Sequence, residues 1–373
     1  MPHRAYDLYP QVYDFANLFF AERAAARGKR GRPDVAAFEY HLEDHLLRLR
    51  DVLRAKTYRP GPYRRYTIRQ PKERVIAAAP YRDRVVHHAL CRVIEPLFER
   101  RFSPDSYASR LGKGTHAALD RCTQLARRFP YVLRCDLVQF FSSMDHAVLR
   151  TQLARVIGDP DVLWLCDQIL AGGVDPSPQP ASLVGKGEPD PPLPRTGEGL
   201  GVGACGLPIG NQTSQFWANV YLNALDQYAA RELRCPGYVR YVDDFLLFAP
   251  DKPTLHAWRR EVIAFLATLR LRLHEPEAAV FPVSTGIPFL GFRIYPDHRR
   301  LRRRNGVAFA RRLRTLARGV EAGTVSIERL TASVQGWVAH ASHADTYGLR
   351  RNILRHPFTK PARPESETHH ALA

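Results

Sequence analysis

Apolar and polar residues alternate along this chain with two periods, one typical of helices and one typical of strands. In 35–53, leucine and phenylalanine recur every three or four positions, which predicts one amphipathic helix with a packing face. The same spacing predicts helices at 83–100 and from 216 to 225. A further helical stretch is expected to run to about 356.

Short runs of β-branched and aromatic residues predict strands between these helices. Residues 131–137 form one such run, and 289–295 form another apolar strand with a glycine inside it. Two more short strands, 238–239 and 245–248, flank Asp243 and Asp244. This arrangement predicts a β-hairpin that turns at the two aspartates.

The two aspartates are the residues of this pattern that are most costly to bury. Their turn lacks the Asn-Gly sequence that favours a tight hairpin, so local propensity does not explain it. Buried carboxylates are paired or bind a cation, and Mg²⁺ takes one or two carboxylates together with substrate phosphates. From this stretch alone, a metal site and an exposed Asp-Asp turn are equally good interpretations.

A second carboxylate position follows the strand at 131–137. Asp136 ends that strand, and Asp145 lies nine residues further along, where a helix is expected to begin. Asp145 therefore has a structural explanation as a helix cap, whereas Asp136 does not. We expect Asp136 to complete the metal site.

Net charge points to a polyanionic partner. Among 373 residues, Lys plus Arg exceeds Asp plus Glu by 55 − 37 = 18, and the sequence pI is about 10.0. Nucleic acid is the leading candidate. No apolar run is long enough to span a membrane and no signal-peptide pattern is present, so no membrane partner and a cytoplasmic location are expected. The six cysteines form no C-x-x-C pair and are expected to be small buried residues.

Basic residues gather in three places. Lys72 and Arg74 alternate in strand-prone surroundings and could hold a triphosphate. Arg110 and Lys113 lie in a loop that leads into a helix, where contact with a nucleic-acid backbone is plausible. Between 299 and 318 there are nine arginines and no acidic residue, a density that favours phosphate contact. The candidates from this run are Arg302, Arg303, Arg304, Arg311 and Arg312.

Two stretches have the composition of flexible chain. Residues 172–206 contain nine Gly and seven Pro with no aromatic residue, which predicts a flexible insertion. The polar tail 357–373 is expected to be disordered.

Taken together, these motifs resemble the reverse transcriptases of bacterial retroelements. The sequence Asp-x-x-x-Phe-Phe at 136–141, Tyr-Val-Asp-Asp at 241–244 and Leu-Gly-Phe at 290–292 match their palm motifs in order. The resemblance implies an α+β right-hand polymerase fold. Its expected parts are an N-terminal helical extension (1–58), fingers (59–130), a palm with the insertion (131–298) and a helical thumb (299–356).

One motif narrows the resemblance. Most reverse transcriptases have Gln-Gly-x-x-x-Ser-Pro where this chain has Ile-Gly-Asn-Gln-Thr-Ser-Gln at 209–215, and this variant is similar to the enzymes of diversity-generating retroelements. Such enzymes copy a template-repeat RNA into cDNA with errors at adenines. The resemblance implies template RNA, a cDNA primer and product, dNTPs and an accessory variability protein as partners.

The resemblance also implies roles for individual residues. Asp136 and Asp243 would ligate two Mg²⁺ ions, or Mn²⁺ as the alternative, with Asp244 supporting them and Leu137 beside them. The expected nucleotide-binding residues are Lys72, Arg74, Phe140, Phe141, Ile209, Gly210 and Gln215, of which Phe141 matches the gate that excludes a 2′-hydroxyl. Tyr241 joins the basic residues as a nucleic-acid contact. Related enzymes carry a lysine before Leu-Gly-Phe that this chain lacks, and His274 is the candidate substitute.

Three other functions remain open from the sequence. A group II intron-type reverse transcriptase is the nearest rival, although no zinc-finger or His-Asn-His nuclease pattern follows the thumb. An antiphage-defence reverse transcriptase is the second. An inactive RNA-binding scaffold is the third, and the retention of all three aspartates argues against it.

Overall fold

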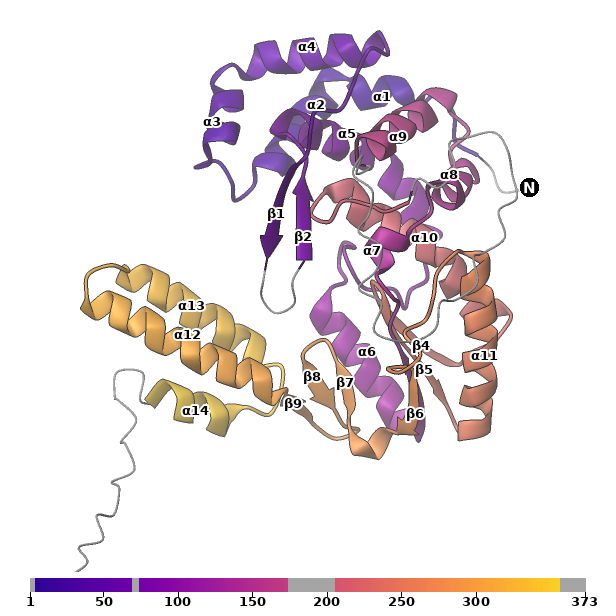
Figure 1. Cartoon of the computed structure of the whole chain (residues 1–373), viewed down its shortest axis with the longest axis vertical. Helices are drawn as coiled ribbons and strands as arrows, with labels where there is room; N and C mark the ends of the chain where they lie inside the picture. The colour runs from indigo at the N-terminus through magenta and orange to yellow at the C-terminus, as the bar shows by residue number, and fades with distance from the viewer. Residues whose placement is uncertain (1–3, 69–73, 174–204, 356–373) are drawn as a thin grey trace, which may run out of the picture.

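The computed structural model describes residues 4–68, 74–173 and 205–355. Helices and sheets alternate along the chain, and helical layers enclose a central antiparallel sheet (Figure 1). Most of the expected insertion, the whole of the expected tail and Lys72 lie outside the described residues. In the described part of the chain, no helix has both the length and the apolar character needed to cross a membrane.

Four N-terminal helices pack together beside a long fifth one. They are α1 (Tyr9–Tyr13), α2 (Phe15–Ala26), α3 (Pro33–Tyr40) and α4 (Leu42–Arg54), and the fifth is α5 (Tyr81–Glu99). The single helix expected at 35–53 is wrong, because the chain breaks at His41, where φ is −120°. The break lets Phe38 pack against Tyr81 of α5 while Leu46 and Leu49 are buried from α4.

A two-stranded antiparallel hairpin, β1 (Arg64–Ile68) and β2 (Arg74–Ala78), extends from the helical layer (Figure 1). Every residue of β1 is exposed. Among the described residues, the backbone hydrogen bonds from this hairpin to other segments go only to the loop that begins at Ile209.

The central sheet has the strand order β4-β5-β3-β6, and all its neighbours are antiparallel. Its strands are β3 (Tyr131–Cys135), β4 (Gly237–Tyr241), β5 (Asp244–Ala249) and β6 (Ala279–Pro282). Alternate residues of β5 enter two different cores: Phe245 and Leu247 pack with α10 (Gln212–Arg231) and α11 (Lys252–Thr268), whereas Leu246 and Phe248 pack with α6 (Thr115–Arg128). Both faces of the sheet are therefore covered by helices.

Three helices link β3 to α10. They are α7 (Phe140–Ser143), α8 (His146–Ala154) and α9 (Pro160–Gly173). Asp145 caps α8, since its carboxylate accepts a hydrogen bond from the Val148 amide at 2.9 Å, as expected from the sequence. Four of the six cysteines are buried, but Cys205 is exposed, contrary to expectation.

A small second sheet follows β6 and a short 3-10 turn, η1 (Val283–Thr285). It consists of β7 (Ile287–Phe289), β8 (Phe292–Ile294) and β9 (Arg299–Leu301). The single strand expected at 289–295 is wrong. Leu290 and Gly291 both have positive φ, 46° and 88°, so the chain reverses there into a tight hairpin.

The C-terminal helices lie on the far side of this small sheet from the central sheet (Figure 1). They are α12 (Arg303–Glu321), α13 (Ile327–Ala341) and α14 (Tyr347–Arg355). A core of their own includes Phe309, Leu313 and Leu330, and the rings of Phe309 and Trp337 stack with centroids 4.1 Å apart.

Candidate active site

The Asp-Asp hairpin forms as expected, with its turn one residue earlier. Tyr241 pairs with Asp244, so Val242 and Asp243 are the two turn residues and Asp244 is the first residue of β5. Val242 has a φ of 57°, which is costly for a β-branched residue. Strain of this kind persists only where the surrounding structure imposes it, and it is concentrated at functional sites.

Strand pairing brings Asp136 to the same place. The last pair between β3 and β5 is Cys135 with Phe245, and one step further sets Asp136 opposite Asp244. Residues directly opposite each other in an antiparallel pair project from one face of the sheet. The side chains of Asp136 and Asp244 therefore lie on the face of the sheet that packs against α6. They lie beyond the part of that face that contacts the helix.

The charges that act on Asp244 agree with this placement. Burial raises the pKa of Asp244 to about 7, Arg134 opposes the shift, and the negative charges of Asp136 and Asp243 add to it. Arg134 Nε lies 3.5 Å from Asp244 Oδ1. Among the described residues, that buried oxygen has no hydrogen-bond partner. Three acidic groups thus lie close together, with Arg134 and Arg302 near them.

This donor set fits a hard divalent cation. Carboxylate oxygens are the ligands that Mg²⁺ prefers, and the carboxylates of Asp136, Asp243 and Asp244 act on one another at this position. In the described chain, no three His, Cys, Asp or Glu side chains are placed to hold a metal by themselves. Mg²⁺ usually completes its shell with waters and substrate phosphates, so one or two carboxylates suffice until substrate arrives.

The neighbouring backbone fixes the end of β3. Leu137 is buried and forms an isolated antiparallel bridge with Leu273. The next residue, His274, donates its amide to the Asp136 carbonyl at 2.8 Å. His274 therefore lies beside Asp136, and its Nδ1 has no hydrogen-bond partner in the described part of the chain.

One functional residue was missed in the sequence analysis. Arg240 is 0% exposed, and its guanidinium donates to both carboxylate oxygens of Asp226, at 2.6 and 2.7 Å. It also donates to Ser106 Oγ at 2.9 Å and to the carbonyl of Val242, the strained turn residue, at 3.0 Å. An arginine inside an apolar strand next to the Asp-Asp turn was the available signal. A buried arginine needs a buried partner.

A second missed residue joins the loop that begins at Ile209 to β2. Asn211 is buried, accepts from the Ala79 amide at 3.2 Å and donates to the Ala77 carbonyl at 2.9 Å. The Ile209 carbonyl accepts from the Ala77 amide at 3.2 Å. Gly210 has a φ of 113°, and a Cβ there would stand 3.0 Å from Ile76, so only glycine suits this close approach.

The other expected nucleotide-binding residues lie on different elements. Arg74 begins β2, the strand to which the loop is tied. Phe140 is 2% exposed in the core, whereas Phe141 is only partly buried. Gln215 is exposed and accepts a hydrogen bond from Ser109 Oγ at 3.2 Å.

The expected nucleic-acid contacts divide into two groups. Arg110 does not fit its expected role, because its side chain is only 6% exposed, pairs with Glu99 at 2.8 Å and donates to the carbonyls of Ser103 and Ser106. It orders its own loop instead. Lys113 is partly exposed, and its ammonium donates to the Pro104 carbonyl.

Tyr241 and Arg302 are partly buried, and the candidate arginines within α12 are exposed. The Tyr241 hydroxyl is 3.1 Å from Thr115 Oγ1, at the first residue of α6. Arg302 lies near the carboxylates, since burial, Arg304 and Arg134 lower its pKa and Asp244 opposes that shift. The remaining α12 candidates are exposed and form no ion pair with other described residues: Arg303, Arg304, Arg311 and Arg312.

Comparison with known proteins agrees with this geometry. Residues 68–294 match the reverse transcriptase (RNA-dependent DNA polymerase) family. Protein YkfC of Escherichia coli (strain K12) is 28% identical over 291 residues, which cover 66% of this chain and 70% of that protein. Nuclear intron maturase 1, mitochondrial, of Arabidopsis thaliana is 30% identical over 90 residues, 24% of this chain and 13% of that protein.

A solved structure is also similar in part. Apo telomerase from Candida tropicalis, truncated from its C-terminal domain, has a TM-score of 0.46 and 10% sequence identity, and the likeness covers 67% of this chain and 58% of that one. The family match spans the central sheet, the carboxylate turn and the loop tied to β2. The chain therefore belongs to the reverse transcriptase family, whose members use divalent metal ions, and is an RNA-directed DNA polymerase with a right-hand fold.

Proposed function

We propose that Asp136, Asp243 and Asp244 are the carboxylates that hold the catalytic cations, with Mg²⁺ as the working ion and Mn²⁺ as a substitute. The observation that carries this proposal is the placement of the three acidic groups at the ends of β3 and β5, where the charges of Asp136 and Asp243 act on Asp244. When bound, the cations activate the primer 3′-hydroxyl and stabilise the leaving pyrophosphate.

The chain's own residues position the reactants around that centre. Arg134 faces Asp244 and keeps its carboxylate oriented, and Arg240 holds the turn that presents Asp243. Phe141 excludes the 2′-hydroxyl of a ribonucleotide by sterics. Lys72 and Arg74 bind the triphosphate, with Arg74 better suited to bidentate contact because its guanidinium is a planar fork.

The exposed arginines of α12 hold the template–primer duplex through its phosphates. Four of them project from one helix without competing ion pairs among the described residues. Because phosphate contacts release counterions, this binding is steeply salt-dependent and does not read sequence. The protein therefore binds the template RNA and the cDNA whatever sequence is being copied.

The specific role that we propose is mutagenic copying of a template-repeat RNA for a diversity-generating retroelement, with an accessory variability protein as partner. Its support is the Ile209 to Gln215 motif, in which an apolar side chain replaces a glutamine that can hydrogen-bond near the nucleotide sugar. The loop that carries Ile209 is tied to Ala77 of β2, the strand that begins at Arg74. Loss of that polar contact would loosen the selection of correct pairs opposite adenine.

The test is primer extension on an adenine-containing RNA template with Mg²⁺, followed by cDNA sequencing. The proposal expects errors concentrated opposite adenine and fewer of them in Ile209→Gln. Asp243→Asn should lose synthesis, while Asp297→Asn, which alters an exposed acidic residue beside His298, should not. An Ile209→Gln variant with unchanged adenine errors would count against the role of the motif.

A second candidate is an intron-type reverse transcriptase. The observation that favours it is the similarity to the two nuclear intron maturases of Arabidopsis thaliana, each over about a quarter of this chain. Accurate cDNA in the same assay, with or without an accessory protein, would select this candidate over the mutagenic one.

A further inference from the structure

Contacts on one face of α6 hold the C-terminal helices against the central part of the protein. His116, Asp120 and Thr123 lie on that face, because they recur at the spacing of a helix. The Arg299 guanidinium of β9 donates to Asp120 Oδ1 and to Thr123 Oγ1, both at 2.7 Å. The Arg299 carbonyl accepts a hydrogen bond at 2.8 Å from the amide of Asp345, which lies between α13 and α14. We call these contacts the α6 junction.

Two histidine rings stack at the start of this face. The rings of His116 in α6 and His343, two residues after α13, have centroids 3.4 Å apart and planes 14° apart. The ring centroid of His340 in α13 is 6.2 Å from that of His116 and 4.8 Å from that of Phe292 in β8. His116 is partly buried, and within the described chain its buried Nδ1 has no hydrogen-bond partner. His343 is exposed, so protons reach the stack from solvent.

The surroundings of the stack favour neutral rings. Two protonated imidazoles in this arrangement repel each other, whereas neutral ones do not. Burial lowers the pKa of His116, and His343 and His340 lower it further. Of the other charged groups that act on His116, Asp120 opposes the shift and Arg299 adds to it. Burial and then His343 also lower the pKa of His340. Protons are therefore bound more weakly while the junction is closed.

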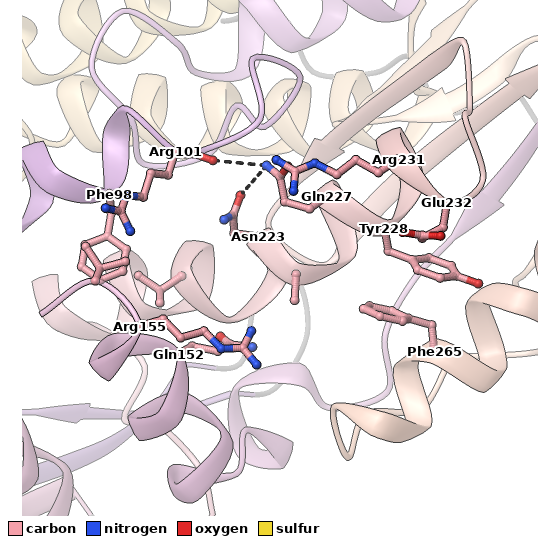
Figure 2. A pocket seen from close by; sticks show the side chains of 13 residues that line it. Phe98, Arg101, Gln152, Arg155, Asn223, Gln227, Tyr228, Arg231, Glu232 and Phe265 are labelled. Atoms are coloured by element: carbon pink, nitrogen blue, oxygen red, sulfur yellow. Dashed lines mark hydrogen bonds between the residues drawn. The ribbon is translucent and has the colours of Figure 1, made fainter. Parts of the chain in front are cut away.

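The same end of α6 contacts the carboxylate hairpin. Thr115, the residue before His116, donates its hydroxyl to the Tyr241 hydroxyl at 3.1 Å, and Tyr241 pairs with Asp244. The histidine stack thus connects the C-terminal helices to the helix end that touches this hairpin. None of the junction residues lines the cavity beside α10 and α11 (Figure 2).

We propose that the stack of His116 and His343 is a pH-sensitive contact that holds the C-terminal helices on α6 while its rings are neutral and releases them when its rings are protonated. His116 is a positioning residue in this device and does not touch the reacting atoms. The released state binds protons more readily, so docking is complete above the ordinary histidine pKa of about 6.5 and weakens as pH falls below it. Each ring that gains a proton on release lowers the docking equilibrium about tenfold per pH unit.

Amide hydrogen exchange of the full chain tests the contact directly. The Asp345 amide reports docking, because its hydrogen bond to the Arg299 carbonyl crosses the junction. After correction for the intrinsic pH dependence of exchange, its protection should fall about tenfold or more from about pH 7.5 to 5.5. The Val283 amide, which donates to the Pro130 carbonyl at 2.9 Å, reports the stability of the central part in the same sample.

The variants separate a titrating role from a merely structural one. His116→Phe keeps a ring for stacking but removes the proton site, so the loss of Asp345 protection in acid should shrink to about threefold or less. Val283 should respond to pH as it does in the unchanged chain. His343→Phe, at an exposed position, should give the same result even if a change inside α6 prevents folding. His256→Phe, an exposed histidine of α11, is the matched control and should behave as the unchanged chain does.

Duplex binding gives a second measurement, which rests on the proposed role of the α12 arginines. By fluorescence anisotropy without divalent metal or dNTP, affinity for a primer–template duplex should fall in acid and should fall less in His116→Phe. Charge alone predicts the opposite sign, because protonated histidines attract phosphates. Loss of Asp345 protection with unchanged duplex affinity would support the pH-sensitive contact and contradict the role of α12.

Two results would overturn the proposal. The first is equal Asp345 protection at both pH values in the unchanged chain. The second is an equally large acid loss of that protection in the unchanged chain, His116→Phe and His343→Phe.

Discussion

Replacing Arg240 with lysine should lower the rate of DNA synthesis, and by more than is expected for a core substitution that only lowers stability. The substitution keeps a positive charge against Asp226 but replaces a planar fork of five donors with one ammonium. In the structure the guanidinium reaches both oxygens of Asp226, Ser106 Oγ and the carbonyl of Val242. Lysine can retain the ion pair with Asp226, but its single ammonium cannot also reach the Val242 carbonyl at the turn.

The magnitude follows from the bonds that are lost. Losing the hydrogen bonds to Ser106 and Val242 should lower the free energy of unfolding by about 2–3 kcal/mol at roughly 1–1.5 kcal/mol each. Full removal, as in Arg240→Met, leaves the buried Asp226 charge without a cation, with the Tyr238 hydroxyl still donating to it, and should cost about 3–5 kcal/mol. If the bond to Val242 is what holds Asp243 in place, its loss corresponds to a fall in kcat of about tenfold.

The assay measures urea unfolding and steady-state primer extension at a temperature where the variant is folded. Arg240→Lys should lower kcat with little change in the KM for dNTP, because the nucleotide contacts are untouched. Arg150→Lys is the matched control: Arg150 pairs with Asp167 at 2.8 Å on the surface, and its loss should cost under about 1 kcal/mol and leave kcat unchanged. The positioning role would be refuted if Arg240→Lys lost stability yet kept kcat within twofold.

Three further predictions concern stability and binding. Asp145→Ala removes the cap of α8 and the ion pair with Arg270, so chemical unfolding should show a loss of about 1–2 kcal/mol, with polymerase activity retained below the transition; an unchanged midpoint would contradict this role. Burial lowers the pKa of His87 to about 3, below its ordinary value of about 6.5, so the neutral form is favoured in the fold. Stability should then fall as pH drops below about 6.5 toward 3, and His87→Leu should show a flatter unfolding profile over that window; an equally steep profile would exclude His87 as the cause. Replacing Arg311 and Arg312 with alanine should reduce the slope of log affinity against log salt for duplex by roughly two, measured by anisotropy, and an unchanged slope would place the duplex elsewhere.

The sequence predicted those parts of the fold that depend on local pattern. The strands around the Asp-Asp turn, the strand that ends at Asp136 and the cap at Asp145 each follow from residue type and spacing. Their meeting point depends on strand pairing between segments more than a hundred residues apart. Only the resemblance to reverse transcriptases supplied that pairing before the structure did.

The wrong predictions have physical causes that cannot be inferred from the local sequence pattern. The expected helix at 35–53 breaks because its two halves pack against different neighbours. The strand expected at 289–295 reverses because Leu290 accepts a positive φ beside Gly291, and no local rule predicts that for a leucine. Arg110 was assigned to phosphate contact because its partner, Glu99, lies eleven residues away in another element.

Arg240 shows the opposite case, where a signal was present but not interpreted. Its partner Asp226 lies fourteen residues earlier on α10, and both side chains are 0% exposed. A charged residue inside an apolar strand predicts a buried partner but does not say which one. The structure supplies the identity of that partner and shows that the pair supports the turn.

The most direct test of the central claim is primer extension on a defined RNA template with dNTPs and Mg²⁺, comparing the unchanged chain with Asp243→Asn. Both proteins should have the same free energy of unfolding within about 1 kcal/mol, because Asp243 is a partly exposed residue of the hairpin turn and not part of the hydrophobic core. The account predicts RNA-templated cDNA from the unchanged chain and a loss of product of at least about a hundredfold from the folded variant. Equal cDNA synthesis by both proteins would contradict the assignment of the carboxylate turn as the catalytic centre.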